Sequence, residues 1–189
     1  MSILILGLAV FLGVHMLTTL RPARAAVIGR LGEGSYKGLY SLASAVGLVL
    51  IVWGFGRYRS GGYIQLWDPP MALWPLTWGL MWFSFVTLVA ANAPLGKIKS
   101  MLRHPMLVGV KLWALAHLLV NGDLGSLILF GAFLAFAVYD RIAVKRRGDT
   151  RAPPVPAFTS GDVIALGAGT ALYAAMFWLH PWLIGVPIA

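Results

Sequence analysis

Six long apolar runs account for most of this sequence, and they constrain its fold more than any other feature. They occupy residues 3–20, 38–56, 71–91, 106–121, 124–144 and 163–185, and each is 16 to 23 residues long. Their only Lys, Arg, Asp or Glu residues are Lys111 in the fourth run and Asp140 and Arg141 near the end of the fifth. Because about 20 apolar residues form a helix that crosses a hydrocarbon layer about 30 Å thick, we predict an all-α polytopic membrane helix bundle with about six transmembrane helices.

The composition supports this class. Hydrophobic residues make up 59% of the 189 residues, and charged residues only 11%. The runs leave no room for a separate soluble domain, so we expect residues 1–189 to form a single transmembrane domain. Cysteine is absent from the sequence, which excludes disulfides, cysteine-based zinc and iron–sulfur sites and covalently attached c-type haem. A metal would need His, Met, Asn or carboxylate ligands.

The basic residues are distributed unevenly among the connections. Twelve Lys or Arg residues lie in or beside the connections after the first, third and fifth runs, against two, Arg57 and Arg59, in the remaining connections. The positive-inside rule then places the odd-numbered connections in the cytoplasm and both termini outside the cytoplasm. The twelve are Arg21, Arg24, Arg30, Lys37, Lys97, Lys99, Arg103, Arg141, Lys145, Arg146, Arg147 and Arg151.

The formal net charge of +9 raises the question of nucleic-acid binding. The cations are spread over three short connections, where helix orientation and attraction to anionic lipid account for them. We therefore expect the lipid bilayer as a partner and no nucleic acid.

Several polar residues beside the runs suit helix starts. Ser35, Asp123 and either Ser160 or Asp162 precede or begin predicted helices and are suited to accept hydrogen bonds from free helix amides, while Pro105 suits a first helical turn. We predict structural and not catalytic roles for them.

Ionisable side chains are costly inside a bilayer, so the few that lie there are functional candidates. They are His15, Lys111 and His117. His104 and His180 lie near the edges of their runs, where water lowers the cost. Lys111 shares a helix face with His104, and we consider two roles for it: extension of its amine toward the interface, or an ion pair with a carboxylate of a bound cofactor.

Helix geometry separates the histidines of the fourth run. His104 and His117 are 13 residues apart, which turns them about 220° away from each other on one helix, so they cannot share a ligand. His117 lies beside Trp113 and Asn121, four residues before and after it. A second axial ligand would come from His15, the other deep histidine. The face of His15 carries Leu4, Leu8, Phe11 and Thr19.

Two neutral imidazoles flanked by aromatic and aliphatic side chains suit a flat, apolar porphyrin. Other arrangements stay open. Along the helices, His15 lies about 8 Å and His117 about 18 Å from the cytoplasmic end, so His15 with His104, or a single histidine, are alternatives. Each histidine could instead serve only as an interhelical hydrogen-bond partner.

Three segments resemble the NnrU family. They are the stretch from Arg103 to Asp123, which includes His104, Pro105, Gly109, Trp113 and His117; the Gly13-Val14-His15 segment; and residues 36–41. The resemblance runs from about residue 3 to residue 147. NnrU proteins are in turn similar to 15-cis-zeta-carotene isomerase, an integral membrane protein that binds haem b through histidines.

The resemblance implies non-covalent haem b, with His15 and His117 matching the isomerase's iron ligands and His104 a further histidine of the motif. Candidate cofactor-binding residues are therefore His15, His117, His104, Lys111, Trp113 and Asn121. The resemblance also implies that the protein lies in the bacterial inner membrane. Its implied role is the expression or maturation of nitrite and nitric oxide reductases during denitrification, or redox chemistry with a membrane redox partner.

Two alternatives accompany this hypothesis. One is a haem-dependent cis-trans isomerase acting on a lipophilic polyene, although Ala114 stands where the isomerase has a cysteine. The other is a non-catalytic membrane scaffold.

Overall fold

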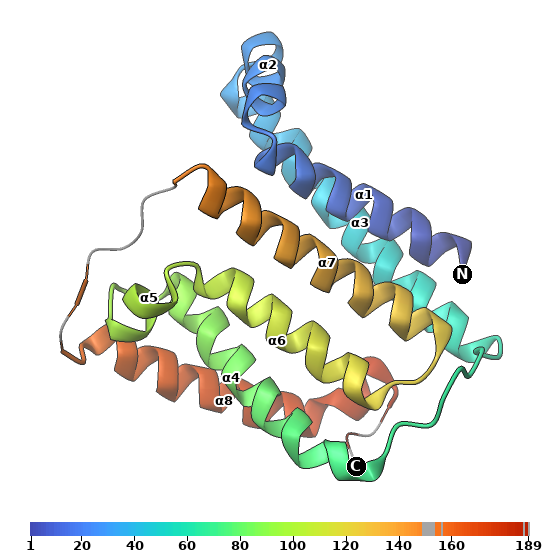
Figure 1. Ribbon diagram of the computed structural model, residues 1–189. Coiled ribbons are helices and arrows are strands. Elements are labelled where there is room, and N and C mark those ends of the chain that lie inside the picture. The colour runs from blue at the N-terminus through green and yellow to red at the C-terminus, as the bar shows by residue number, and fades with distance from the viewer. Residues whose placement is uncertain (149–153, 156, 187, 189) are drawn as a thin grey trace. The chain divides into compact units, whose positions relative to one another are not determined.

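The computed structural model describes residues 1–148, 154–155, 157–186 and 188, and within them the chain is helical (Figure 1). Arg151, counted above among the basic residues, lies outside the described residues. The helices are α1 (Ser2–Thr19), α2 (Arg21–Leu31), α3 (Glu33–Ser60), the 3₁₀ helix η1 (Met71–Leu73), α4 (Trp74–Asn92), α5 (Lys97–Leu102), α6 (Pro105–Val120), α7 (Leu124–Arg146) and α8 (Ser160–Ile184).

Every predicted apolar run forms a helix. Five spans, Ser2–Thr19, Glu33–Ser60, Met71–Asn92, Leu124–Arg146 and Ser160–Ile184, are long and apolar enough to cross a membrane, and the apolar α6 is shorter, with 16 residues. The described residues contain no strand, and their only β-type pairing is an isolated bridge between Gln65 and Asp123. The prediction of an all-α, multi-pass membrane protein is confirmed.

Two helices were not predicted from the runs. α2 carries Arg21, Arg24 and Arg30 and contains no buried residue, and the six-residue α5 carries Lys97 and Lys99. Both lie in the basic connections between the apolar runs, where the sequence contains no apolar run that would predict a helix.

The chain forms two compact units. The first comprises residues 1–68 and 122–144, with α1, α2, α3 and α7; the second comprises residues 69–121 and 145–189, with η1, α4, α5, α6 and α8.

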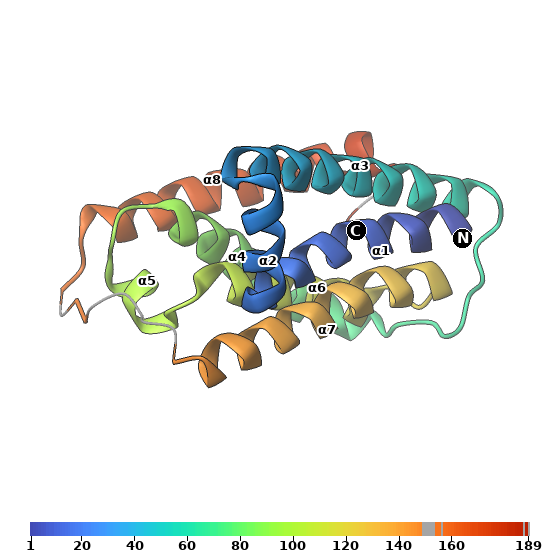
Figure 2. The same cartoon turned by 90° about the horizontal axis from the view of Figure 1, so that it is seen from above.

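In the first unit, α1 and α3 run side by side (Figure 2). Glycines permit their close contact, since a Cβ at Gly7 would lie 2.6 Å from the Ile51 nitrogen and one at Gly47 only 2.7 Å from the Phe11 nitrogen. Pairing of residue 7 with 51 and 11 with 47 makes the two helices antiparallel.

The fourth helix of this unit, α7, contacts α1 and α3 through larger side chains. Phe133 lies 5.6 Å from Phe11 of α1, and Phe130 lies 6.5 Å from Phe55 of α3, measured between ring centroids. At these positions aromatic packing takes the place of the glycine contacts between α1 and α3, whereas at the start of α7 Gly125 packs directly on the Tyr58 ring.

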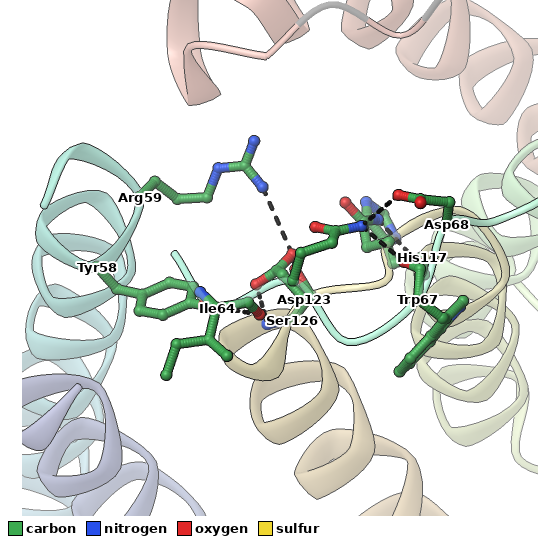
Figure 3. Close-up of polar contacts among 10 residues, drawn as sticks. Tyr58, Arg59, Ile64, Trp67, Asp68, His117, Asp123 and Ser126 are labelled. Atoms are coloured by element: carbon green, nitrogen blue, oxygen red, sulfur yellow. Dashed lines mark hydrogen bonds and ion pairs between the residues drawn. The ribbon is translucent and has the colours of Figure 1, made fainter. Parts of the chain in front are cut away.

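The loop between α3 and η1 is fastened to the start of α7 (Figure 3). The Leu66 and Trp67 amides donate to the Gly122 carbonyl at 2.8 and 3.1 Å, and the Leu124 amide donates to the Ile64 carbonyl at 2.9 Å. Asp123, only 2% exposed, accepts from the Ser126 amide at 3.0 Å and from the Ser126 hydroxyl at 2.6 Å. It therefore caps α7, as predicted.

Arg59 completes the polar cluster at the start of α7. Its guanidinium lies 3.5 Å from the Asp123 carboxylate and 5.0 Å from the ring centroid of Tyr63. Figure 3 shows the guanidinium directed at the carboxylate from the end of α3. The Tyr58 hydroxyl accepts from the Ile64 amide at 3.0 Å.

In the second unit, α4 packs against both α6 and α8. Its core consists of Val86 and Ala90 from α4 and Ala165 from α8. The buried Ser84 hydroxyl donates to the Gly109 carbonyl of α6 at 2.9 Å.

The start of α8 is held by a carboxylate. Thr159 is the N-cap residue, and Asp162 accepts from its amide at 2.9 Å, which completes a capping box. Asp162 also accepts from the amides of Lys97 and Ile98, at 2.8 and 2.7 Å, and so binds the first turn of α5. The predicted role of Asp162 is confirmed, whereas Ser160 is the first helical residue and not the cap.

Pro105 begins α6, as predicted. The prediction for Ser35 is wrong, because α3 starts at Glu33, before it. The N-cap residue is Gly32, with φ 78° and ψ 158°, a backbone conformation that glycine adopts without steric strain. Because glycine has no capping side chain, the sequence pattern does not indicate a helix start of this kind.

Candidate functional site

In the first unit, His15 lies one turn before the end of α1. Its Nδ1 is 2.7 Å from the carbonyl oxygen of Phe11, four residues earlier. Because a carbonyl oxygen only accepts, Nδ1 is the protonated nitrogen, and a neutral ring then has its lone pair on Nε2. No hydrogen-bond partner of Nε2 lies among the residues that the structure describes. This is the tautomer that ligates a metal through Nε2.

Aromatic side chains from three helices surround the His15 ring. Phe11 of α1 stacks on it with 4.2 Å between centroids and 28° between planes. Tyr40 of α3 lies 5.4 Å away, and Phe136 of α7 presents its edge at 6.1 Å. Phe11 was expected from the face of α1. Tyr40 and Phe136 were not, because single-helix geometry does not show which helices are neighbours.

In the second unit, His117 occupies the last turn of α6 and has the same local arrangement. Its Nδ1 lies 2.8 Å from the Trp113 carbonyl oxygen, and its ring centroid lies 5.2 Å from that of Trp113. The Asn121 side chain donates to the His117 carbonyl oxygen at 2.8 Å and so satisfies the end of the helix. The predicted proximity of Trp113 and Asn121 to His117 is confirmed. Nδ1 is again the protonated nitrogen.

The remaining candidates also lie on α6. His104 is its N-cap residue, and its carbonyl accepts from the amides of Leu107 and Val108 at 3.1 and 3.3 Å. Since α6 is continuous, His104 and His117 are separated by about 20 Å along the axis, and the two do not share one metal ion. Lys111 is partly buried in the middle of the helix. Cofactor contacts by His104 and Lys111 stay predictions.

A strained turn precedes His104. Arg103 has φ 66° and ψ −39°, and among the described residues it is the only non-glycine with positive φ. The His104 amide donates to the Leu102 carbonyl at 2.7 Å, which makes Leu102–His104 a γ-turn of the rare, strained form. The sequence contains no glycine or asparagine here that would indicate such a turn.

His180 of α8 differs from the other two. Its Nδ1 lies 2.7 Å from the carbonyl oxygen of Val186, beyond the end of the helix. In the described part of the chain, no three His, Cys, Asp or Glu side chains form a cluster that could hold a metal ion.

Single imidazoles fit a haem. The porphyrin supplies four ligands to the iron, and the protein adds one or two, most often histidine. His15 and His117 each have Nδ1 bonded to a backbone carbonyl oxygen and an aromatic neighbour in contact with the ring.

Comparison with known proteins gives one family. Residues 3–188 match the family described as NnrU protein, so the match includes α8, beyond the part that resembled the family in the sequence analysis. No curated protein and no solved structure matches the chain. With nearly its whole length matched, the chain belongs to the NnrU family.

Proposed function

We propose that this multi-pass membrane protein binds haem b non-covalently, with His15 and His117 as the iron ligands. The observation that carries the proposal is that both imidazoles form the same kind of hydrogen bond, each within its own helix. Each Nδ1 contacts the carbonyl oxygen four residues earlier on its own helix, at 2.7 Å for His15 and 2.8 Å for His117. Such a bond fixes the tautomer and the ring orientation and increases the basicity of Nε2.

The surroundings of both rings support an apolar, planar ligand. Phe11, Tyr40 and Phe136 contact His15, and Trp113 contacts His117. Aromatic side chains bury large apolar areas and favour stacked or edge-on contact with a flat ring system.

Haem supplies one-electron redox chemistry, and the protein binds it, orients it and excludes water from it. For this family member we propose membrane redox chemistry that serves the expression or maturation of nitrite and nitric oxide reductases, in the inner membrane of a denitrifying bacterium. Ala114 is fully buried in α6 and offers no thiol where the carotene isomerase has one, which favours this role over polyene isomerisation.

The first experiment measures bound haem. The chain is purified in detergent from a haem-supplemented host, and haem b per protein is determined by the pyridine haemochrome method. We expect one haem in the wild type, strong loss in His15→Ala and in His117→Ala, and wild-type content in the control His180→Ala. Haem-free wild type, or unchanged content in both variants, would reject the cofactor assignment.

The second experiment assigns the role. The gene is deleted in a denitrifying host and replaced by the wild type or by His15→Ala. Restored nitrite and nitric oxide reductase activity with the wild type alone supports the proposal. Conversion of 15-cis-zeta-carotene in a host that accumulates it, without any effect on denitrification, would favour the isomerase instead.

A further inference from the structure

Two buried hydroxyls of α3, those of Tyr36 and Ser44, have no hydrogen-bond partner among the described residues, and Tyr36 is the one that lies beside a cation. Tyr36, in the first turn of α3, is only 5% exposed, and its hydroxyl forms no hydrogen bond within the described part of the chain. Leaving a buried hydroxyl without a hydrogen-bond partner is unfavourable. A ligand that accepts a hydrogen bond from the Tyr36 hydroxyl would explain why a phenol is buried at this position.

Tyr36 is connected to His15 through Tyr40. The rings of Tyr36 and Tyr40, one turn apart on α3, are stacked with centroids 6.2 Å apart. The Tyr40 ring then lies 5.4 Å from His15. The unpartnered Tyr36 hydroxyl therefore belongs to a residue one helical turn from Tyr40, which contacts His15, on the side of α3 that begins after α2. A ligand bound at His15 could extend in that direction.

A cation lies against the same tyrosine. The Arg24 guanidinium carbon of α2 is 5.5 Å from the centroid of the Tyr36 ring. The nearby carboxylate, Glu33, is paired with Lys37 at 2.8 Å. No carboxylate among the described residues lies within 4 Å of the Arg24 guanidinium, and Glu33 attracts Arg24 only from a longer distance. A phenol donor and a guanidinium donor together suit an oxyanion, for which charge-assisted hydrogen bonds are strong.

From this we infer that Tyr36 and Arg24 bind a carboxylate of the tetrapyrrole, one of its two propionates, while His15 binds its iron. The inference rests on the proposed function and deepens it. The charged edge of the cofactor would lie at the basic end of α1 and α3, and its apolar part among Phe11, Tyr40 and Phe136. This orientation keeps the carboxylate at the helix ends, where its burial is least costly.

The experiment compares two cofactors and matched variants. Protein is loaded with haem b or with its dimethyl ester, in which both propionates are masked, and the rate of haem transfer to apomyoglobin is measured. The test variants are Tyr36→Phe, which keeps the ring and removes the hydroxyl, and Arg24→Gln. Their controls are Tyr58→Phe, whose hydroxyl is bonded to Ile64 at the other end of α3, and Arg30→Gln, exposed on the same α2.

With haem b we expect Tyr36→Phe and Arg24→Gln to release the cofactor about tenfold faster, as loss of a hydrogen bond to a charged group would give. The controls should change the rate less than about twofold, because Arg30 is exposed and Tyr58, although buried, lies at the end of α3 away from His15. With the dimethyl ester, whose carbonyl oxygens accept more weakly than a carboxylate, the ratio of the Tyr36→Phe to the wild-type release rate should be clearly smaller than with haem b. In resonance Raman spectra, the propionate bending band should shift in Tyr36→Phe. Circular dichroism and thermal midpoints identify any variant that is misfolded.

Two results would overturn the inference. The first is a ratio of the Tyr36→Phe release rate to the wild-type release rate that is the same with both cofactors, including a ratio of one. The second is an effect that belongs to lipid: loss of bound phosphatidylglycerol from Tyr36→Phe in nanodiscs, with haem release unchanged, would assign the pair to a headgroup phosphate. Haem binding that depends on His15 and His117 but not on Tyr36 would leave the proposed function intact, whereas a haem-free wild type would remove both.

Discussion

The hydroxyl of Thr19 donates a 2.8 Å hydrogen bond to the Asp140 carboxylate and thereby connects α1 to α7. The same oxygen lies 3.4 Å from the carbonyl oxygen of His15, one turn earlier. The connection therefore stabilises α1 beside α7 close to His15, where Phe136 of α7 contacts the imidazole.

Thr19→Val removes this hydroxyl with little change in volume. Interhelical hydrogen bonds in membrane proteins contribute about 0.6 kcal/mol on average and up to about 1.7. We expect the free energy of unfolding in a denaturing detergent titration to fall by about 1 kcal/mol. The control is Thr18→Val, whose exposed hydroxyl donates to the His15 carbonyl within α1, and an equal loss in both variants would contradict the interhelical role.

Gly47→Ala tests the close contact of α1 with α3. The added methyl group would lie 2.7 Å from the Phe11 nitrogen and 2.9 Å from its Cα, so backbone must move. Overpacking of this kind destabilises by about 1–3 kcal/mol. Because the Phe11 carbonyl binds Nδ1 of His15, bound haem should also decrease.

Gly13→Ala is the matched control, since a Cβ at Gly13 has no atom within 4 Å. It should leave both the thermal midpoint and the haem content unchanged. A Gly47→Ala protein as stable as Gly13→Ala would show that the two helices do not pack through Gly47.

Asp162→Asn weakens the connection between α8 and α5. The carboxylate accepts from three backbone amides, those of Lys97, Ile98 and Thr159, and an amide side chain replaces one acceptor oxygen by a donor. Leaving buried amides without an acceptor destabilises by about 1–3 kcal/mol each. We expect earlier thermal unfolding and faster proteolysis between residues 93 and 103, with the exposed Asp68→Asn unaffected.

Arg103→Gly separates backbone strain from side-chain function. Glycine adopts the φ of 66° without the steric strain of a side chain, and relief of such strain is of order 1–3 kcal/mol. The thermal midpoint should therefore rise in Arg103→Gly but not in Arg103→Ala, which loses the guanidinium and keeps the Cβ. Equal midpoints for the two variants would contradict strain at this turn.

The helices were predictable because each apolar run is long and nearly free of charge. The ends were less predictable. α3 begins five residues before its apolar run, at Glu33, and ends four residues after it, at Ser60, since charged and polar residues at helix ends reach water. α2 and α5 are basic and gave no apolar signal.

For the candidate site, positions on a single helix were predicted correctly and neighbours from other helices were not. Trp113 and Asn121 follow from the four-residue spacing around His117, as Phe11 does around His15. Tyr40 and Phe136 depend on how α3 and α7 pack against α1, and the turn at Arg103 depends on a backbone conformation that its residue type does not favour.

The central claim is most directly tested by the absorption spectrum of the purified protein, oxidised and reduced, together with its electron paramagnetic resonance spectrum. Ligation by His15 and His117 should give six-coordinate, low-spin haem b. The haem that His15→Gly or His117→Gly still binds should be high-spin, and added imidazole should restore the low-spin spectrum. A wild-type spectrum without a Soret band, or low-spin haem that persists in both glycine variants, would contradict the account.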